Sequence, residues 1–415
     1  MSLDLSRLSG FYKEIYGDSL EKLVPENSVL VKRINFSKQD KIGNKFHQNV
    51  LVSMEKGFTH AGPSAGAFTL NSSIGLRTQD AQVDGFQFLL RSAAAYNVLT
   101  RATSSKEAFM EATSLIFENM VESMTQRLEV EMLYGSNGLG LTSGSVNQSA
   151  TTTRVQLTAA TWASGIWAGQ EDLIVNFYNS TPTQIGGDFT IYQIDTENRY
   201  LFVSGSAGDI TALDAATAGG LDIFFDGAFG NEMAGLDEII TNTGTLFNIS
   251  ATTYNLWKAN TFSTSGQLSM AKVLAGLSKA VDRGLKENVI CLVNPKTWTD
   301  LHADQAALRL YDSSYSKSKF ENGAEDIRYH YQNGMVEVVS HPCVKQGEAF
   351  VIPPKRYMRI GSWDISFKVP GEPEDKIVFD QPSNAGKEFR SYTEQSIFGS
   401  HPAKSLKISG FTNSV

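Results

Sequence analysis

Two short motifs contain a serine of the kind that serine enzymes use as a nucleophile. Residues 62–66, GPSAG, match G-x-S-x-G, in which the serine must stand on a strained turn between a strand and a helix. The residues that follow have no helical periodicity, which favours a chance match. Residues 314–317, SYSK, match S-x-x-K, but the companion motifs S-D-N and K-T-G are absent. Ser64 is therefore kept only as the nucleophile of an alternative hypothesis, an intracellular serine hydrolase.

Residues that could bind a metal or a cofactor are few and scattered. The two cysteines, Cys291 and Cys343, lack C-x-x-C spacing and are expected to be reduced and buried. No phosphate-binding glycine motif occurs, and the acidic loops of residues 188–226 lack the spacing of a calcium loop. We therefore expect no catalytic residue, no cofactor and no metal. The histidines occur one at a time, at His47, His60, His302, His330, His341 and His401.

Charge is distributed unevenly along the 415 residues, whose formal net charge is −8. From Thr151 to Gly235 two arginines face ten acidic residues, so this segment carries the whole excess. A dedicated nucleic-acid-binding domain is not expected, because it needs a concentrated basic face. The acidic segment should face water. No apolar stretch is long enough to span a membrane and no signal-peptide pattern is present, so a cytoplasmic protein is expected.

The N-terminal part reads as an arm followed by a basic ribbon. Residues 1–28 form the arm, which ends near a proline. Val29–Phe36 and Asn49–Met54 are apolar and β-branched, which predicts a two-stranded ribbon. Between Val29 and His60 six basic residues face two acidic ones. The loop from Gly57 to Gly75 has too few large apolar residues to be a core element and should be mobile unless a partner covers it.

The clearest predicted element is a helix from Ser104 to Gly135. Ser104 and Glu107 form a capping box, and Gly135 stands where a left-handed C-terminal cap is expected. About 30 residues of helix would span roughly 45 Å. Its polar face carries six glutamates against two basic residues. The apolar stripe consists of Ala108, Ala112, Ile116, Met120, Met124, Leu128 and Met132, widened by Phe109, Phe117 and Val121.

The rest of the chain divides into a β-rich unit and a mixed α/β unit. After a polar linker from Ser136 to Thr153, short strands separated by glycine turns predict a small all-β unit. Ser269 should cap a helix, followed by a buried strand from Val289 to Val293 and a helix from Pro295. Met335–Val339 and Ala349–Ile352 are predicted to pair. The strands of the β-rich unit are expected at Val155–Leu157, Leu173–Tyr178, Phe189–Ile194, Tyr200–Val203 and Leu221–Phe225.

This order of parts resembles the major capsid proteins of tailed bacteriophages, which have the Hong Kong 97-type fold. The resemblance implies an α+β chain with an N-terminal arm (1–28), an extended E-loop hairpin (29–95), a spine helix with part of the peripheral domain (96–150), an inserted all-β domain (151–235), an axial domain (236–365) and a C-terminal return to the peripheral domain (366–415). The segments similar to the axial domain are GLDEII (235–240), YNLWK (254–258), VNPKTW (293–298) and HPCVKQGEAFVIP (341–353).

The resemblance also implies a function, a shell subunit that assembles with itself as hexamers and pentamers into an icosahedral capsid around double-stranded DNA. The expected location is the virion capsid, assembled in the host bacterial cytoplasm, with scaffolding, portal and cement proteins as further partners, non-specific contact with packaged DNA and no membrane. An encapsulin-like cellular compartment is the alternative that keeps the fold. We expect no lysine–asparagine cross-link between subunits.

Opposite charge predicts which surfaces of neighbouring subunits meet. The basic ribbon should lie over the acidic face of a neighbour's spine helix, because an isolated two-stranded ribbon is only marginally stable in water. The candidate contact residues on the ribbon are Lys32, Arg33, Lys38, Lys41 and Lys45, and those on the helix are Glu107, Glu111, Glu118 and Glu122.

Overall fold

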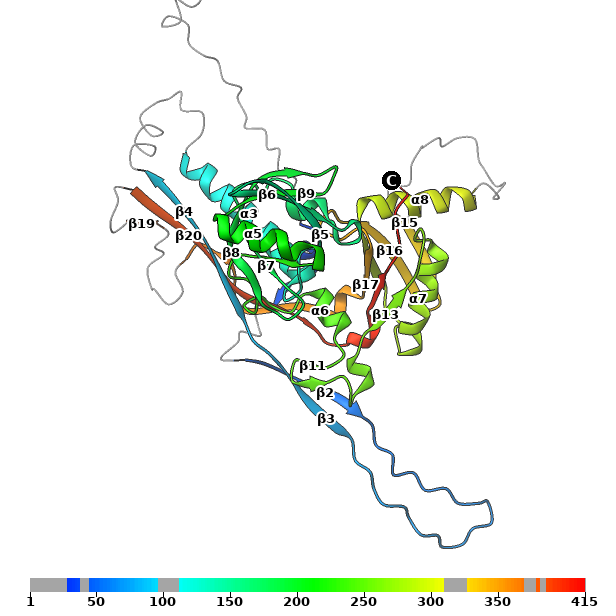
Figure 1. The fold of residues 1–415 in the computed structure, drawn as a ribbon. Helices are drawn as coiled ribbons and strands as arrows, with labels where there is room; N and C mark the ends of the chain where they lie inside the picture. The colour runs from blue at the N-terminus through cyan, green and yellow to red at the C-terminus, as the bar shows by residue number, and fades with distance from the viewer. Residues whose placement is uncertain are drawn as a thin grey trace, which may run out of the picture.

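Figure 1 presents the computed structural model, which describes residues 28–37, 45–95, 112–309, 327–368, 378–380 and 386–414. Several predictions fall on other residues and lie outside the described ranges. These are the arm up to residue 27, Lys38, Lys41, Ser104, Glu107, Glu111 and the SYSK motif at 314–317.

A six-stranded mixed sheet forms the core of the C-terminal half. Its strand order is β13 (Asn260–Ser263), β21 (Leu406–Ser409), β17 (Glu348–Ile352), β14 (Val289–Val293), β16 (Gly334–Ser340) and β15 (Ile327–Tyr331). Helices α7 (Met270–Asp282) and α8 (Pro295–Arg309) lie beside it (Figure 1). The predicted cap of α7 is confirmed, because the Ser269 hydroxyl accepts a hydrogen bond from Lys272 N.

One predicted pairing in this sheet is wrong. Strands β16 and β17 do not pair with each other, because β14 lies between them, parallel to β16 and antiparallel to β17. All five residues of β14 are buried. A strand that is apolar on both faces is most stable in the centre of a covered sheet, which explains the placement.

A second sheet packs against the long helix α3 (Ala112–Tyr134). Its strands follow the order β1 (Phe36–Ser37), β18 (Tyr357–Ser366), β20 (Gly386–Gly399) and β19 (Val378–Asp380), and β4 (Phe86–Ala95) pairs with β20. Phe117 of α3 meets Phe389 of β20 edge to face, with 5.1 Å between ring centroids. The apolar stripe predicted for the helix therefore faces this sheet over its first turns.

The C-terminal end of α3 is buried all round. Every residue from Leu128 to Tyr134 is buried, so here the helix lies between the units of the molecule instead of on its surface. Helix α3 ends at Tyr134, as expected from Gly135, but the left-handed residue is Ser136, at φ 69°, one position later than predicted.

The β-rich unit is an antiparallel six-stranded sheet. Its order is β10 (Asp222–Phe225), β7 (Ile174–Tyr178), β8 (Gln184–Asp195), β9 (Tyr200–Ser204), β6 (Thr152–Leu157) and β5 (Thr142–Ser149). The five predicted strands are confirmed, whereas β5 lies in the segment predicted as a linker. The unit is not all-β, because α4 (Ser164–Trp167) and α5 (Ala207–Ala216) belong to it. Helix α5 begins at the cap of Ser206, whose side chain accepts from Asp209 N.

The chain enters and leaves the β-rich unit through a narrow crossing of two glycines. Gly235 N donates to Gly135 O at 2.9 Å. A Cβ on Gly135 would lie 2.3 Å from Met233 O, so a side chain cannot be accommodated there. The crossing leads into α6 (Leu236–Thr241) and the small hairpin of β11 (Thr245–Leu246) and β12 (Ile249–Ser250). Short 3-10 turns complete the body at Ala159–Thr161, Thr217–Gly219, Asn255–Trp257, Pro354–Arg356 and Pro402–Lys404.

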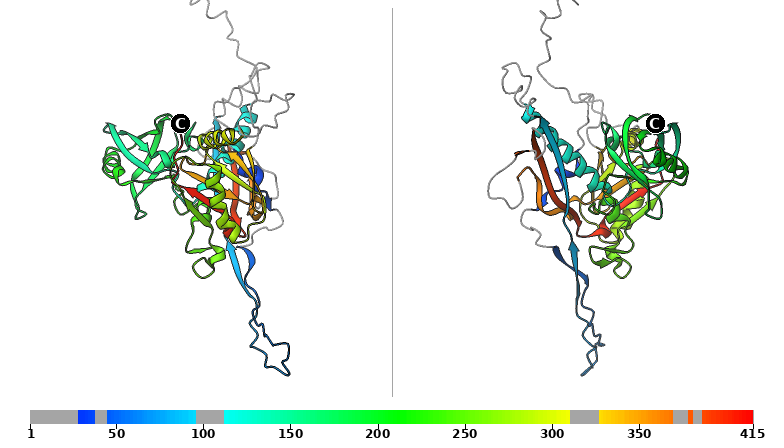
Figure 2. Two further views of the ribbon diagram at one scale, coloured as in Figure 1. Left: turned by 90° about the vertical axis from the view of Figure 1, so that its right-hand side faces the viewer. Right: turned by 60° about the vertical axis from the view of Figure 1, so that its left-hand side comes forward.

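A long hairpin of residues 46–83, called the arm from here on and distinct from the N-terminal residues 1–28, projects from the body. It is built differently from the predicted ribbon. Strand β2 (Phe46–Ser53) pairs antiparallel with β3 (Arg77–Val83), and residues 54–76 continue outward to the tip (Figures 1 and 2). The segment predicted as the first ribbon strand holds the short helix α1 (Leu30–Arg33) and β1, which joins the second sheet beside β18. Leu30 and Ile34 are fully buried there, so this apolar run serves the body.

Candidate assembly surfaces

The outer part of the arm, residues 51–76, exposes large apolar side chains to solvent. Large exposed apolar side chains mark surfaces that bind another molecule when they gather in one place. The backbones of the two sides remain together beyond the strands, because Lys56 N donates to Ile74 O at 3.0 Å. The exposed side chains, each at least half accessible, are Leu51, Met54, Phe58, Phe68, Leu70, Ile74 and Leu76.

The root of the arm is packed firmly into the body. Phe46 of β2 and Phe247 both contact Phe398 of β20, with ring centroids 5.7 and 5.3 Å apart. Ala81 and Val83 of β3 are buried. The arm is therefore anchored at one end, while the side chains of its apolar outer part stay exposed among the residues that the structure describes.

The arm as the structure defines it carries no net formal charge. Residues 46–83 contain two basic residues, Lys56 and Arg77, and two acidic residues, Glu55 and Asp80. The excess of basic residues in the predicted ribbon came from positions before residue 46. Apolar contact, rather than attraction between opposite charges, is thus the main interaction that this arm can offer.

The described basic candidates lie at the base of the arm and on α1. Arg33 Nη2 forms an ion pair with Glu337 Oε1 at 2.7 Å, and Lys45 Nζ pairs with Asp84 Oδ2 at 3.2 Å. Lys32 is exposed on α1. Two of the three therefore already contact a carboxylate of their own chain. Their role between subunits remains a prediction.

The acidic face of α3 is smaller than the glutamate count indicates. Glu118 is exposed and Glu122 is half-buried, so both remain candidates. Glu129 and Glu131, which the sequence places on the same polar face, are buried. Glu131 is paired with Arg127 at 3.0 Å, and burial raises its pKa in spite of that partner.

Buried Glu129 connects three parts of the molecule that are distant in sequence. Its carboxylate accepts hydrogen bonds from the backbone N–H groups of Val29, Leu30 and Val31, at 2.8, 2.5 and 2.9 Å. The same carboxylate contacts His341 Nε2 at 2.7 Å, and both side chains are fully buried. Glu129 thus caps α1 and attaches it to α3 and to the loop after β16. Sequence periodicity offered no signal for this role.

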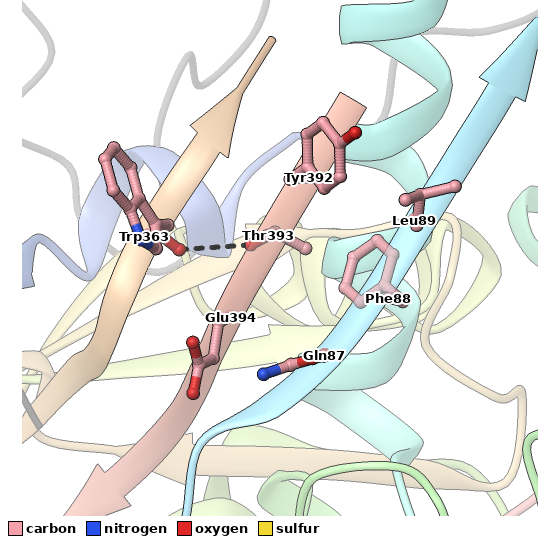
Figure 3. Close-up of a pocket in the computed structure, with 7 residues that line it drawn as sticks. All are labelled: Gln87, Phe88, Leu89, Trp363, Tyr392, Thr393 and Glu394. Atoms are coloured by element: carbon pink, nitrogen blue, oxygen red, sulfur yellow. Dashed lines mark hydrogen bonds between the residues drawn. The ribbon is translucent and has the colours of Figure 1, made fainter. Parts of the chain in front are cut away.

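Two grooves lie on surfaces near the arm. The first, of about 550 Å³, opens on the outer face of the second sheet between β4, β18 and β20 (Figure 3). Leu89 lies opposite Tyr392 in the pairing, and Glu394 lies opposite both Gln87 and Trp363, so these side chains share one face. Leu89 is 49% exposed. The second groove, of about 650 Å³, runs beside β2 and includes Leu256, Trp257 and His401.

Of the ten carboxylates of the acidic β-rich unit, five are exposed to water, four are half-buried and one is buried. Glu171, Asp172, Asp188, Glu197 and Asp226 are exposed. Glu232 is buried at the glycine crossing instead. Burial and the nearby charge of Glu131 raise the pKa of Glu232 to about 7, although Arg127 opposes the shift.

The structure describes the surroundings of Ser64 and of the two cysteines. Residues 63–64 form a turn on the outer arm between irregular segments, and no strand-to-helix turn surrounds Ser64. Cys291 and Cys343 are free and buried, and burial raises the pKa of Cys291 to about 12. Within the described ranges, no group of His, Cys, Asp or Glu is arranged to hold a metal ion. None of the described helices is long and apolar enough to cross a membrane.

Comparison of the fold with solved structures gives full-length similarities. The chain matches a subunit of the cyanophage A-1(L) capsid over 99% of its own length and 100% of the other chain, with a TM-score of 0.58 and 10% identity. This chain has the fold of a phage capsid protein. It also matches the capsid protein of the native GTA particle, with a TM-score of 0.52, 8% identity and coverage of 99% and 100% of the two chains.

The similarity to solved capsid structures comes with very low sequence identity. A match to the SrpI encapsulin complex of Synechococcus elongatus PCC 7942 covers 100% of this chain and 98% of the other, at 7% identity and with a TM-score of 0.47. No protein-family model matches the sequence, and no curated protein matches it.

Proposed function

We propose that this chain is the structural subunit of an icosahedral phage capsid, which assembles with itself as hexamers and pentamers and encloses double-stranded DNA. The observation that carries the proposal is the arm, anchored in the body and covered with apolar side chains at its outer end. Burying one such side chain contributes about 1.5 to 3 kcal/mol. A surface of this kind is stable in water when a second copy covers it.

Within this proposal, the parts of the chain take the roles of a Hong Kong 97-type subunit. The β2–β3 arm serves as the E-loop, α3 as the spine helix, the second sheet as the peripheral domain and the six-stranded mixed sheet as the axial domain. The unit between the two crossing glycines serves as the inserted domain. Its exposed carboxylates favour a position away from DNA, since phosphates would repel them.

The acceptor for the arm is the body of a neighbouring subunit. The groove of Leu89, Trp363 and Tyr392 supports this assignment, because it offers apolar surface on a sheet face in the same chain (Figure 3). Arm and groove are complementary in polarity, since both combine exposed apolar side chains with few charges. One copy can therefore offer its arm while accepting that of the next, which permits a closed ring.

Negative-stain electron microscopy of the purified full-length protein tests the proposal. Closed shells are expected. A monodisperse monomer at concentrations where capsid proteins assemble would contradict the proposal and would favour a different use of the fold. Nucleic acid recovered from particles after nuclease treatment of their exterior separates a phage capsid from an encapsulin-like compartment, which is the second candidate because it shares the shell architecture.

A serine hydrolase using Ser64 remains the third and least supported candidate. Its active site would have to form at the end of an exposed arm. Labelling by a serine-reactive probe that disappears in Ser64→Ala would favour it over a structural role.

A further inference from the structure

A buried group of one lysine and two carboxylates lies where the mixed sheet meets the glycine crossing. Lys407 of β21 contacts Asp237 Oδ1 at the start of α6, and its Nζ is 2.8 Å from Glu348 Oε1 at the start of β17. The three side chains are only 11%, 10% and 16% exposed. Lys407 and Asp237 are 170 positions apart in the chain, so only the tertiary structure brings them together.

The surroundings suit a reaction between the amine and the carboxyl group. Asn137 Nδ2 donates to Asp237 Oδ2 at 2.9 Å, which orients the carboxyl group and withdraws electrons from its carbon. Glu348 Oε1 is within hydrogen-bonding reach of Lys407 Nζ, where a proton acceptor is needed. The other oxygen, Glu348 Oε2, is buried without a hydrogen-bond partner. The ring of Phe350, with its centroid 5.6 Å from Lys407 Nζ, adds an apolar wall.

We propose that Lys407 and Asp237 condense to an intramolecular isopeptide bond, with Glu348 as the group that carries the protons. The Lys407 ammonium passes a proton to Glu348, and the neutral Nζ attacks Cγ of Asp237. One oxygen of Asp237 then leaves as water, with two of the three ammonium protons, and Glu348 returns to its starting state. The atoms and charges balance, since an ammonium and a carboxylate become an amide and one water.

The charges that remain near the group after condensation are of opposite sign. Lys345 is buried beside the group, and its Nζ donates to Gly138 O at 2.7 Å and lies 4.0 Å from the Tyr134 ring centroid. Burial lowers the pKa of Lys345, and the Glu348 carboxylate is the strongest opposing influence. Condensation removes one positive and one negative charge, so the net charge of the group is unchanged, and the Glu348 carboxylate and the Lys345 ammonium remain as charges of opposite sign.

The same electrostatics set the pace of the reaction. Burial acts to lower the pKa of Lys407, but Glu348 and Asp237 together raise it. The newly folded protein therefore starts as an ion pair, and the amide forms slowly after folding, as the proton moves to Glu348. The bond would fasten the C-terminal strand β21 to the helix that follows the glycine crossing.

Intact-mass spectrometry of the full-length protein, denatured after prolonged incubation in the folded state, tests the inference. The expected mass is that of the sequence less one water, and digestion should yield a branched peptide that joins Lys407 to Asp237. The chain should also migrate faster than its linear form in denaturing electrophoresis, because the bond closes a large loop. A wild-type mass equal to that of the sequence, with no branched peptide, would overturn the inference and leave a simple ion-pair cluster.

Three variants show which residues are responsible. Lys407→Arg keeps the charge but should abolish the loss of water, and Glu348→Gln should abolish it or slow it at least tenfold. Lys404→Arg is the matched control, because Lys404 also pairs with a carboxylate, Glu287, at 2.9 Å, and should leave the loss of water unchanged. Loss of water that persists in Lys407→Arg would show that the bond forms elsewhere. If a variant does not fold, the mass of the wild-type protein alone still shows whether the isopeptide bond forms.

Discussion

The outer arm and the interior of the body reverse the usual distribution of side chains. The arm exposes Phe58, Leu70 and Ile74 to solvent, whereas the body buries Glu129, Lys345 and Lys407. Each buried charge has partners within the chain, as with Glu129 and its three backbone donors. Within the described part of the chain, the apolar groups of the outer arm stay exposed. The buried charges thus find their partners in one subunit, whereas the proposed assembly would cover the arm with a second.

The largest effect is expected from charges placed on the outer arm. Phe58→Asp combined with Leu70→Asp should abolish shell formation, because each lost apolar contact removes about 1.5 to 3 kcal/mol per subunit contact. The melting temperature of the unassembled subunit should stay unchanged. Sedimentation and thermal unfolding measure the two quantities. Shells formed by this variant in normal yield would refute an assembly role for the arm.

Removal of a buried carboxylate should lower the stability of the unassembled subunit, which the arm variant leaves unchanged. Glu129→Ala leaves three N–H groups and His341 without their acceptor, and breaking a buried pair costs about 3 to 5 kcal/mol. Denaturant unfolding of the unassembled subunit should detect this loss. Glu118→Ala, on the exposed part of the same helix, is the control and should change stability by less than about 0.5 kcal/mol. Equal stabilities for the two variants would contradict the importance assigned to Glu129.

The buried Glu232 should make stability depend on pH. Its pKa is raised by burial and by Glu131 to about 7 in the folded protein, so the folded state binds a proton more tightly than the unfolded state. The stabilisation is complete below the unfolded pKa of about 4.5 and is lost as pH rises through about 7. Over this window the loss amounts to at most about 3 kcal/mol.

Glu232→Gln tests that pH dependence directly. The variant should lose less stability than the wild type between pH 5 and 8, as measured by denaturant unfolding at each pH. Parallel curves for the two proteins would show that Glu232 does not titrate in this window. The exposed Asp226→Asn, in the same unit, is the matched control and should leave the slope unchanged.

The smallest effect is expected from the basic candidates. Replacing Lys38, Lys41 and Lys45 by glutamate should slow assembly and weaken its dependence on salt, because exposed pairs contribute only about 0.2 to 1 kcal/mol each and act mainly on encounter. Light scattering at several salt concentrations follows the rate. An unchanged rate and salt response would exclude electrostatic guidance and leave apolar contact as the only interaction of the arm.

Local patterns in the sequence were sufficient to predict much of the secondary structure. The caps and periodicity of α7, the buried strand β14 and five strands of the β-rich unit follow from residues that are neighbours in the chain. Burial of Cys291 and Cys343 also follows from residue type. These features depend on short-range geometry, in which the side chains of one element face a common direction.

Pairing between distant segments was decided by the tertiary structure. The run from Val29 to Phe36 has the composition of a strand, yet Leu30–Arg33 is a helix, whose first N–H groups bind Glu129 about a hundred positions later in the chain. Strand β2 therefore pairs with β3 instead.

For the candidate assembly surfaces, too, some properties followed from the sequence and others only from the tertiary structure. The sequence by itself determined the charge counts, and it predicted a basic ribbon between Val29 and His60 followed by a loop from Gly57 to Gly75. Only the tertiary structure decided that residues 46–83 form an arm beyond the reach of its own core, and that Glu129 and Glu131 lie inside the protein. The physical reason is that periodicity identifies the polar face of a helix, whereas burial of that face depends on which other segments pack against it.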